Sequence, residues 1–247
     1  MKFYDRVQEL EILREIEAMS AESAQMTMMV GRRRVGKTTL LRNAFIATPV
    51  LYFFIGRKNE ILLCEEFTEE IEAKLGETFG RFSSFAQLFK VLMQLSKRKN
   101  FTLIIDEFQE FRNISRSLFS DMQNIWDANK EESRINLVIC GSIYSMMKQI
   151  FENSKEPLYG RATARMHIHP FEISTLKEIL TDNYPDYKPE DLLAFYLLTG
   201  GVAKYIEQLV IRKAFTKEKI LKAVLSPGSY FLEEGKDVLI EEFGRDY

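Results

Sequence analysis

Residues 26–41 read MTMMVGRRRVGKTTLL, and this stretch decides the fold. An apolar segment ends at Gly31, and residues 31–38, GRRRVGKT, satisfy the pattern GxxxxGK[ST] directly before a helical segment. Glycines let the backbone curl so that successive N–H groups face inward, and the helix that follows adds the positive end of its dipole. The sequence therefore predicts a phosphate-binding loop between a strand and a helix.

This loop supplies most of the candidate ligand contacts. Lys37 is expected to reach the terminal phosphates as a point charge, and the Thr38 hydroxyl to complete the shell of a Mg2+ ion that keeps most of its waters. The arginines occupy variable positions, whose side chains generally leave the cradle. They form either a solvated loop face or a contact with a phosphate, an acidic partner or nucleic acid. The predicted nucleotide-binding positions are Gly31, Arg32, Arg33, Arg34, Val35, Gly36, Lys37, Thr38 and Thr39.

A second motif follows the apolar run 101–105, which ends in Asp106 and Glu107. Consecutive strand side chains point to opposite sides, so one carboxylate can face a metal shell while the other faces an attacking water. We assign Asp106 to the metal and Glu107 to the water. The structural alternative is that two acids open a polar turn.

The spacing of apolar runs predicts an α/β fold. Unalternated runs at 26–30, 50–55, 101–105 and 135–140, with a weaker one at 166–168, suit strands covered on both faces. Helical patterns separate them, and only helical patterns follow residue 172, the last at 230–243. We expect a three-layer sandwich with a mainly parallel five-stranded sheet in residues 1–174, and a helical lid subdomain in residues 175–247.

Composition narrows the functional classes. The chain has 247 residues, 46% of them hydrophobic, and 34 basic against 36 acidic side chains, so it lacks a global field for attracting a polyanion. No apolar stretch approaches the roughly 18 residues of a membrane helix, and the N-terminus does not resemble a secretion signal. Cys64 and Cys140 lie in apolar surroundings, which predicts two reduced, buried thiols and a cytoplasmic location.

Taken together, MMVGRRRVGKTTLL and FTLIIDEFQ resemble the P-loop ATPases of the STAND and AAA+ grouping, specifically the MNS-type archaeal/bacterial ATPase family. Further marks are FYDRVQELEIL, CGSIYSMM, PLYGRAT and HPFEISTLKEIL. The resemblance implies a P-loop NTPase sheet in which the strand ending at Cys140 lies between the two motif strands. It places Ser142 near the terminal phosphate as a sensor, where the residue pattern alone indicates a capping serine.

The resemblance also implies roles for residues outside the two motifs. Arg161, in PLYGRAT, matches a family arginine that stabilises charge on the leaving phosphate, in its own chain or across a subunit contact. Tyr4, Arg6 and Tyr205 are the candidates for an adenine pocket. Ala203 departs from the family pattern because it occupies a proline position.

Family members usually continue into a winged helix and often a nuclease-like domain, whereas this sequence ends at Tyr247. It is expected to be either a short member or one without the DNA-facing module, and DNA binding does not follow from these residues. His167 and His169 lie two apart and would suit a metal only if other ligands converged on them.

The sequence thus predicts a Mg2+-dependent ATPase in which hydrolysis drives a conformational switch. ATP and ADP are the expected ligands, with an unknown protein client and a possible homo-oligomer. Three alternatives stay open: an ATP-loaded scaffold, a DNA-associated regulator with slow turnover, and a small-molecule kinase. The adjacent acid pair favours water over a metabolite as the phosphate acceptor.

Overall fold

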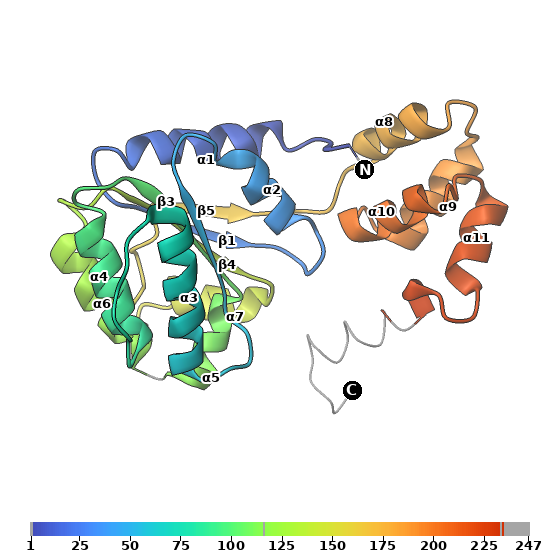
Figure 1. Cartoon of the computed structure of the whole chain (residues 1–247). Coiled ribbons are helices and arrows are strands. Elements are labelled where there is room, and N and C mark those ends of the chain that lie inside the picture. The colour runs from blue at the N-terminus through green and yellow to red at the C-terminus, as the bar shows by residue number, and fades with distance from the viewer. Residues whose placement is uncertain (1, 116, 233, 235–247) are drawn as a thin grey trace. The chain divides into compact units, whose positions relative to one another are not determined.

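A computed structural model describes residues 2–115, 117–232 and 234 of the chain. Its centre is a five-stranded parallel sheet in the order β2-β3-β4-β1-β5 (Figure 1). The strands are β1 (Gln25–Val30), β2 (Val50–Phe54), β3 (Phe101–Asp106), β4 (Ile135–Gly141) and β5 (Ala164–His167). The predicted α/β fold is confirmed, as is the position of β4 between the two motif strands.

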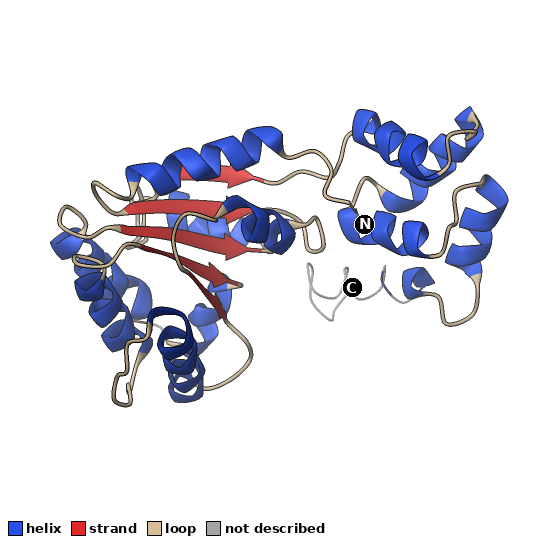
Figure 2. Ribbon diagram, turned by 45° about the horizontal axis from the view of Figure 1, so that its top comes forward, coloured by secondary structure: helices blue, strands red, loops and turns tan. Residues whose placement is uncertain are grey.

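The strands lack polar alternation because helices lie on both faces of the sheet (Figure 2). Every residue of β1, β3 and β4 is buried. Alternate residues of β1, β2, β3 and β4, such as Met26, Met28 and Val30 of β1, join one large apolar core. The helices that fill this core carry matching apolar stripes, among them Phe67 of α3 and Phe85 of α4, and these two rings contact each other edge to face.

Helices separate the strands, as the sequence predicted. Helix α3 (Glu60–Leu75) begins where the Asn59 side chain accepts a hydrogen bond from Leu62 N and ends at left-handed Gly76. Helix α1 (Val7–Met19) precedes the first strand. The other helices between the strands are α2 (Lys37–Ala44), α4 (Phe85–Leu95), α5 (Phe111–Ile114), α6 (Leu118–Asn129) and α7 (Tyr144–Glu152), with a short 3-10 turn at Phe108–Glu110.

The chain divides into two compact units. The core unit comprises Val7–Gly31 and Lys37–Ile168, and the helical unit comprises the described residues up to Arg6, Arg32–Gly36, and the described residues from His169 onward. The helical unit contains α8 (Ile173–Asn183), α9 (Pro189–Thr199), α10 (Ala203–Ile211) and α11 (Lys217–Leu225) around its own apolar cluster. The boundary predicted between residues 174 and 175 stays a prediction, and most of the predicted helix at 230–243 lies outside the described residues.

Two further expectations concern the chain as a whole. Within the described ranges, no helix has the length and apolar character needed to cross a bilayer.

Cys64 and Cys140 are free and buried, as predicted. Burial raises the pKa of the Cys64 thiol to about 12 and the pKa of the Cys140 thiol well above its ordinary value. Both thiols are therefore inert at neutral pH.

Candidate nucleotide and metal site

Three functional segments meet at the carboxyl edge of the sheet. β1 runs into Gly31, β3 ends at Asp106, and β4, which pairs with both, ends at Gly141. Parallel strands present their carboxyl ends at one edge, which is where open α/β sheets hold their ligands. The sheet order therefore brings together the motifs that the sequence separates by about seventy residues.

The phosphate loop has the backbone geometry of an anion cradle. Gly36 has φ 105°, a value that side chains rarely tolerate, and Arg34 is left-handed at φ 67°. Val35 N donates to the Arg32 carbonyl at 3.2 Å, which closes a tight turn before α2 begins at Lys37. This turn leaves the start of the helix facing the loop, as anion binding requires.

Lys37 is held within the loop that it follows. Its side chain is only 8% exposed, and Nζ donates to the Gly31 carbonyl at 2.7 Å. Thr38 is half-buried, while Thr39 points outward and is exposed. The ammonium group is thus fixed beside the first glycine of the cradle, which limits the entropy lost when it binds a phosphate.

The three loop arginines have different environments. Arg32 and Arg33 are exposed, in agreement with a solvated loop face. Arg34 instead lies with its guanidinium carbon 5.1 Å from the centre of the Tyr230 ring and forms an ion pair with buried Glu234. The structure thus gives Arg34 a contact within the helical unit.

Asp106, the predicted metal ligand, is buried and oriented by two donors. Its Oδ1 accepts from Glu107 N at 3.0 Å, and its Oδ2 accepts from the Tyr52 hydroxyl. Tyr52 also hydrogen-bonds the Thr38 side chain. Burial, followed by the Asp106 carboxylate, raises the Tyr52 pKa above its ordinary value, so the phenol stays a proton donor. One hydroxyl therefore joins the two predicted metal ligands.

Sequence reasoning missed Tyr52. The only signal was a tyrosine within an apolar strand, since a buried phenol needs a polar partner. Identifying that partner requires the knowledge that β2 lies beside β3. The donor set itself suits Mg2+, because the Thr38 hydroxyl and the Asp106 carboxylate are the hard oxygen ligands that this ion prefers.

Glu107 has a distinct backbone conformation and its own partners. It is left-handed at φ 56° and ψ 40°, so the chain turns sharply after Asp106. Its Oε2 accepts from Gln109 Nε2 at 2.5 Å and from Ser142 Oγ at 2.7 Å. The two acids consequently have different partners, and Ser142 joins Glu107 at the same edge.

Gln109 was also absent from the sequence-based candidates. It is 1% exposed, and its Oε1 has no hydrogen-bond partner within the described structure. A side chain on Gly141 would approach this oxygen to 2.7 Å and overlap Met147. Gly141 therefore leaves the space that allows the Gln109 amide to face Glu107.

Arg161 does not join these residues. It precedes β5, and the next residues bond to the start of β1, with Thr163 N donating to the Met26 carbonyl at 2.8 Å. Met26 and Gly31 are separated by about 16 Å at about 3.3 Å per strand residue, so Arg161 lies at the opposite, amino edge of the sheet. Its guanidinium pairs with Asp127 at 2.7 Å. This placement corrects the expectation that Arg161 acts on a phosphate of its own chain.

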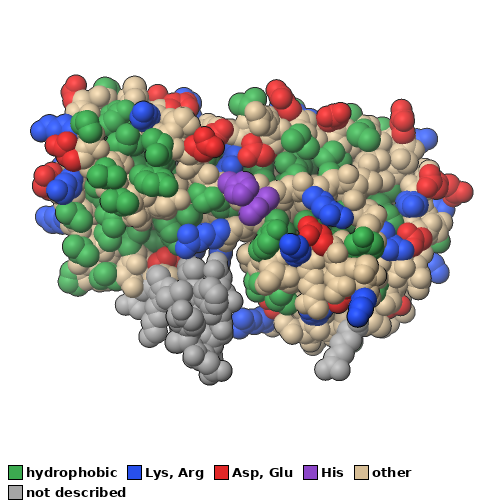
Figure 3. All heavy atoms as spheres, turned by 180° about the vertical axis from the view of Figure 1, so that it is seen from behind, with side chains coloured by type: hydrophobic (Ala, Val, Ile, Leu, Met, Phe, Trp, Pro, Cys, Tyr) green, Lys and Arg blue, Asp and Glu red, His purple; other side chains and the backbone are tan. Residues whose placement is uncertain are grey.

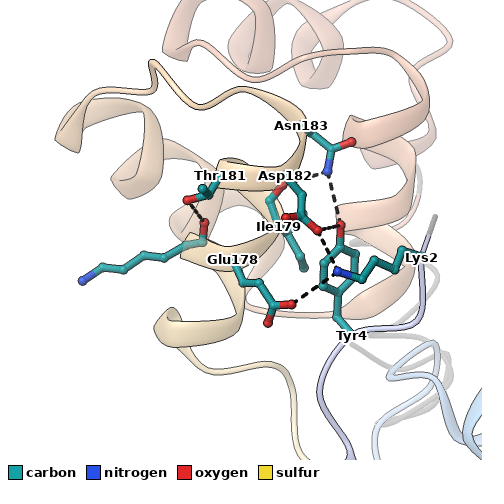
Figure 4. Close-up of polar contacts among 8 residues, drawn as sticks. Lys2, Tyr4, Glu178, Ile179, Thr181, Asp182 and Asn183 are labelled. Carbon is teal, nitrogen blue, oxygen red and sulfur yellow. Dashed lines mark hydrogen bonds and ion pairs between the residues drawn. The ribbon is translucent and has the colours of Figure 1, made fainter.

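The proposed adenine-pocket residues are engaged inside the helical unit. Tyr4 is 4% exposed within the apolar cluster, and its hydroxyl donates to Asp182 at 3.1 Å beside Lys2 (Figure 4). Arg6 donates to the His169 carbonyl at 2.6 Å and lies over the Phe171 ring. The buried Tyr4 ring leaves no open face for a base, so its predicted role is not supported.

Two other candidates have defined surroundings. The Tyr205 hydroxyl donates to Glu234 at 2.8 Å, so Tyr205 shares the partner of Arg34. The His167 ring stacks on Tyr144 with 5.3 Å between ring centres. Among the residues described, no cluster of three or more His, Cys, Asp or Glu side chains could hold a metal.

Comparison with known proteins supports this description of the fold. The family of ATPase domains found predominantly in Archaea matches residues 3–209. An uncharacterised protein of Methanocaldococcus jannaschii is 26% identical over 84% of this chain, and the chain spans 44% of that protein's length.

Solved structures share the fold at low sequence identity. A Walker-type ATPase of Pyrococcus abyssi superposes with a TM-score of 0.70 at 19% identity, covering 97% of this chain and 74% of that one. The ORC2 protein of Aeropyrum pernix, in ADPNP and ADP complexes, gives 0.66 at 14% identity over 90% and 67% of the two chains. A STAND protein with a tetratricopeptide repeat sensor from Pyrococcus horikoshii gives 0.54 at 15% identity over 97% and 32%.

Proposed function

The chain belongs to this family of ATPase domains, and from that premise we propose that it binds Mg2+-ATP at the carboxyl edge of the sheet and hydrolyses it to drive a conformational switch. The observation that supports the proposal is that Lys37 and Thr38 follow β1 and that Asp106 and Glu107 follow β3 at the same carboxyl edge of the sheet, with β4 between the two strands. Each has the chemistry that its step requires, and the Tyr52 hydroxyl contacts both Thr38 and Asp106.

Binding rests on the phosphate loop and on Asp106. The loop N–H groups and the Lys37 ammonium receive the phosphates, and charge-assisted bonds of this kind contribute about 1.5–3 kcal/mol each. Thr38 and Asp106 would hold the metal, and the Tyr52 hydroxyl, which hydrogen-bonds both side chains, would fix their positions. Bound Mg2+ would supply charge neutralisation on the phosphate oxygens.

Hydrolysis rests on Glu107. Its carboxylate accepts a proton from the water that attacks the terminal phosphorus, while Ser142 and Gln109 hold that carboxylate in place. The attacking oxygen forms a bond to phosphorus as the bond to the ADP oxygen breaks, and the proton passes to Glu107. A positioned general base contributes about 10² to 10⁴ in rate.

The proposal extends to the setting in which the switch operates. We propose ATP and ADP as the ligands, a protein client, a cytoplasmic location and a homo-oligomer in which Arg161 acts across a subunit contact. Arg161 lies at the amino edge of the sheet, whereas the phosphate loop of the same chain lies at the carboxyl edge. Its position is therefore compatible only with action across a subunit contact. The chain spans 44% of the length of the Methanocaldococcus jannaschii protein, and the identity of the client stays open.

A second candidate, the ATP-loaded scaffold with slow turnover, is favoured by one observation. Glu107 Oε2 already accepts from both Gln109 and Ser142, so this oxygen is occupied by donors of the chain itself and is less available to accept from a water. Single-turnover kinetics separate the two functions. Bound ATP that stays intact over hours identifies the scaffold, whereas release of ADP within minutes identifies the ATPase.

The direct test of hydrolysis is phosphate release by the variant Glu107→Gln. We expect turnover to fall at least about a hundredfold with ATP binding retained, because the amide keeps the shape but not the proton affinity. Glu110→Gln, which changes a carboxylate three residues away, is the matched control and should keep full activity. Undiminished phosphate release by Glu107→Gln would refute the assigned base.

A further inference from the structure

The helical unit contains a pocket that the proposed ATPase site does not use. It has a volume of about 410 Å³ and lies between the end of α10, helix α11 and the turn that follows α11. Its cationic lining consists of Arg212, Lys219 and Lys222, and no carboxylate contributes to the described lining. Its remaining walls are small residues of α11 and the turn, Ala223 and Gly228 among them.

The charge of this region differs from that of the chain. Residues 211–229 contain five basic side chains and one acidic side chain, whereas the whole chain has 34 and 36. Over the face shown in Figure 3, basic and acidic side chains are interspersed. The positive charge around the pocket is therefore a local feature.

Within the part of the chain that the structure describes, no ion pair involves the pocket cations Arg212, Lys219 and Lys222. In the core unit, by contrast, Lys97 pairs with Glu132 at 2.8 Å and Arg112 with Glu156 at 3.0 Å. Neighbouring cations repel one another, and a bound anion would reduce that repulsion.

The walls of the pocket are fixed by hydrogen bonds. Arg212 donates to the Ala223 carbonyl at 3.2 Å, which ties the end of α10 to α11. Buried Ser229 donates to the same carbonyl at 2.8 Å and anchors the turn. The Arg212 guanidinium is thus held in place before any ligand arrives, which reduces the entropy cost of binding.

We propose that this pocket binds phosphate groups of a polyanion, either a nucleic-acid backbone or a free oligophosphate. A guanidinium beside two ammonium groups suits tetrahedral phosphate oxygens, which accept from several donors at once. The volume lies within the range of about 300–1,000 Å³ typical of ligand sites, so a phosphate with an attached group fits. No aromatic side chain is among the described lining residues, which favours backbone contacts over base stacking.

The test uses the full chain and a fluorescent DNA duplex of about 20 base pairs, measured by anisotropy between about 50 and 200 mM salt. Three phosphate contacts weaken binding about 40-fold over this range, because the slope is about −0.9 per contact. Lys219→Ala/Lys222→Ala should weaken binding at least tenfold at low salt and reduce the slope by about two. Lys74→Ala/Lys177→Ala, which removes two exposed lysines outside the pocket, is the charge-matched control and should leave both values unchanged.

A second measurement distinguishes the phosphate source and is independent of the phosphate loop. Pyrophosphate titrated into 15N-labelled protein should produce a saturable shift of the Gly228 amide, and Lys219→Ala/Lys222→Ala should abolish it. A Gly228 shift without duplex binding identifies a free phosphate ligand, and both responses identify a nucleic-acid backbone.

Three results would overturn the proposal. The first is an unshifted Gly228 amide together with no duplex binding. The second is duplex binding that the pocket variant and the control variant weaken equally. The third is a poly-glutamate competitor as effective as pyrophosphate, since it would show that the pocket selects charge and not phosphate.

Discussion

Removing the Tyr52 hydroxyl tests how the metal ligands are positioned. Asp106 is 6% exposed, and its two oxygens accept from Tyr52 and from Glu107 N. In Tyr52→Phe one buried carboxylate oxygen loses its donor, and such a loss costs about 1–3 kcal/mol. The free energy of unfolding should fall by this amount in urea titrations without nucleotide.

The same variant should also weaken the magnesium dependence of nucleotide binding. Mutating an outer hydrogen-bond partner of a metal ligand costs about 10–100-fold in metal affinity. We expect about tenfold, the lower end, because Asp106 keeps its bond from Glu107 N. The assay is the anisotropy of a fluorescent ADP analogue as a function of magnesium concentration.

Tyr159→Phe provides the control, because Tyr159 is 45% exposed and lies in the same unit. It should change neither the urea midpoint nor the magnesium midpoint. If Tyr52→Phe matched Tyr159→Phe in both measurements, the reasoning about Asp106 would be refuted. If stability fell but the magnesium midpoint stayed, Tyr52 would be structural and not a positioning residue.

Three further predictions concern other parts of the chain. Arg161→Ala should leave phosphate release by the monomer unchanged, and a double-mutant cycle with Asp127→Ala should give a coupling below about 1 kcal/mol, as for other surface pairs. Lys213, two residues after the end of α10, is left-handed at φ 51°, so Lys213→Gly should raise the unfolding free energy by about 0.5–1 kcal/mol, and a decrease would show that the strain is absent. The pKa of Cys64 is raised to about 12 in the folded protein, so its stabilising contribution is present below its unfolded value of 9.0 and is lost as pH rises. The buried Cys140 thiol, whose pKa is also raised, contributes in the same way, so urea titrations between pH about 8 and 10 should show a loss of about 1 kcal/mol for each thiol. Cys64→Ala should remove about half of the total loss, and an undiminished loss in the variant would contradict this assignment.

The sequence was sufficient for the sheet because its strands are buried on both faces. A run such as residues 135–140 has no polar alternation, and only a strand within a covered parallel sheet accommodates that pattern. The phosphate loop and the acid pair follow strands, so their shared edge follows from parallel topology. The caps of helix α3, Asn59 and Gly76, are residue types that the sequence displays at both ends of the helix.

The remaining contacts depend on which strands and helices are neighbours. Tyr52 reaches Asp106 only because β2 pairs with β3, and periodicity does not encode that order. Tyr4 is an aromatic residue near the start of the chain whose burial depends on the distant helix α8. The position of Arg161 at the amino edge follows from topology alone, since residues that precede a parallel strand lie at that edge of the sheet.

Calorimetric titration of ATP in the presence of magnesium tests most directly whether the loop and the twin carboxylates form a nucleotide site. The wild-type chain should give a single-site isotherm that weakens when magnesium is chelated, and Lys37→Ala should reduce the affinity by at least about tenfold, as expected for loss of a charge-assisted bond. Absence of heat from the folded wild-type chain, or an unchanged isotherm for Lys37→Ala, would contradict the account.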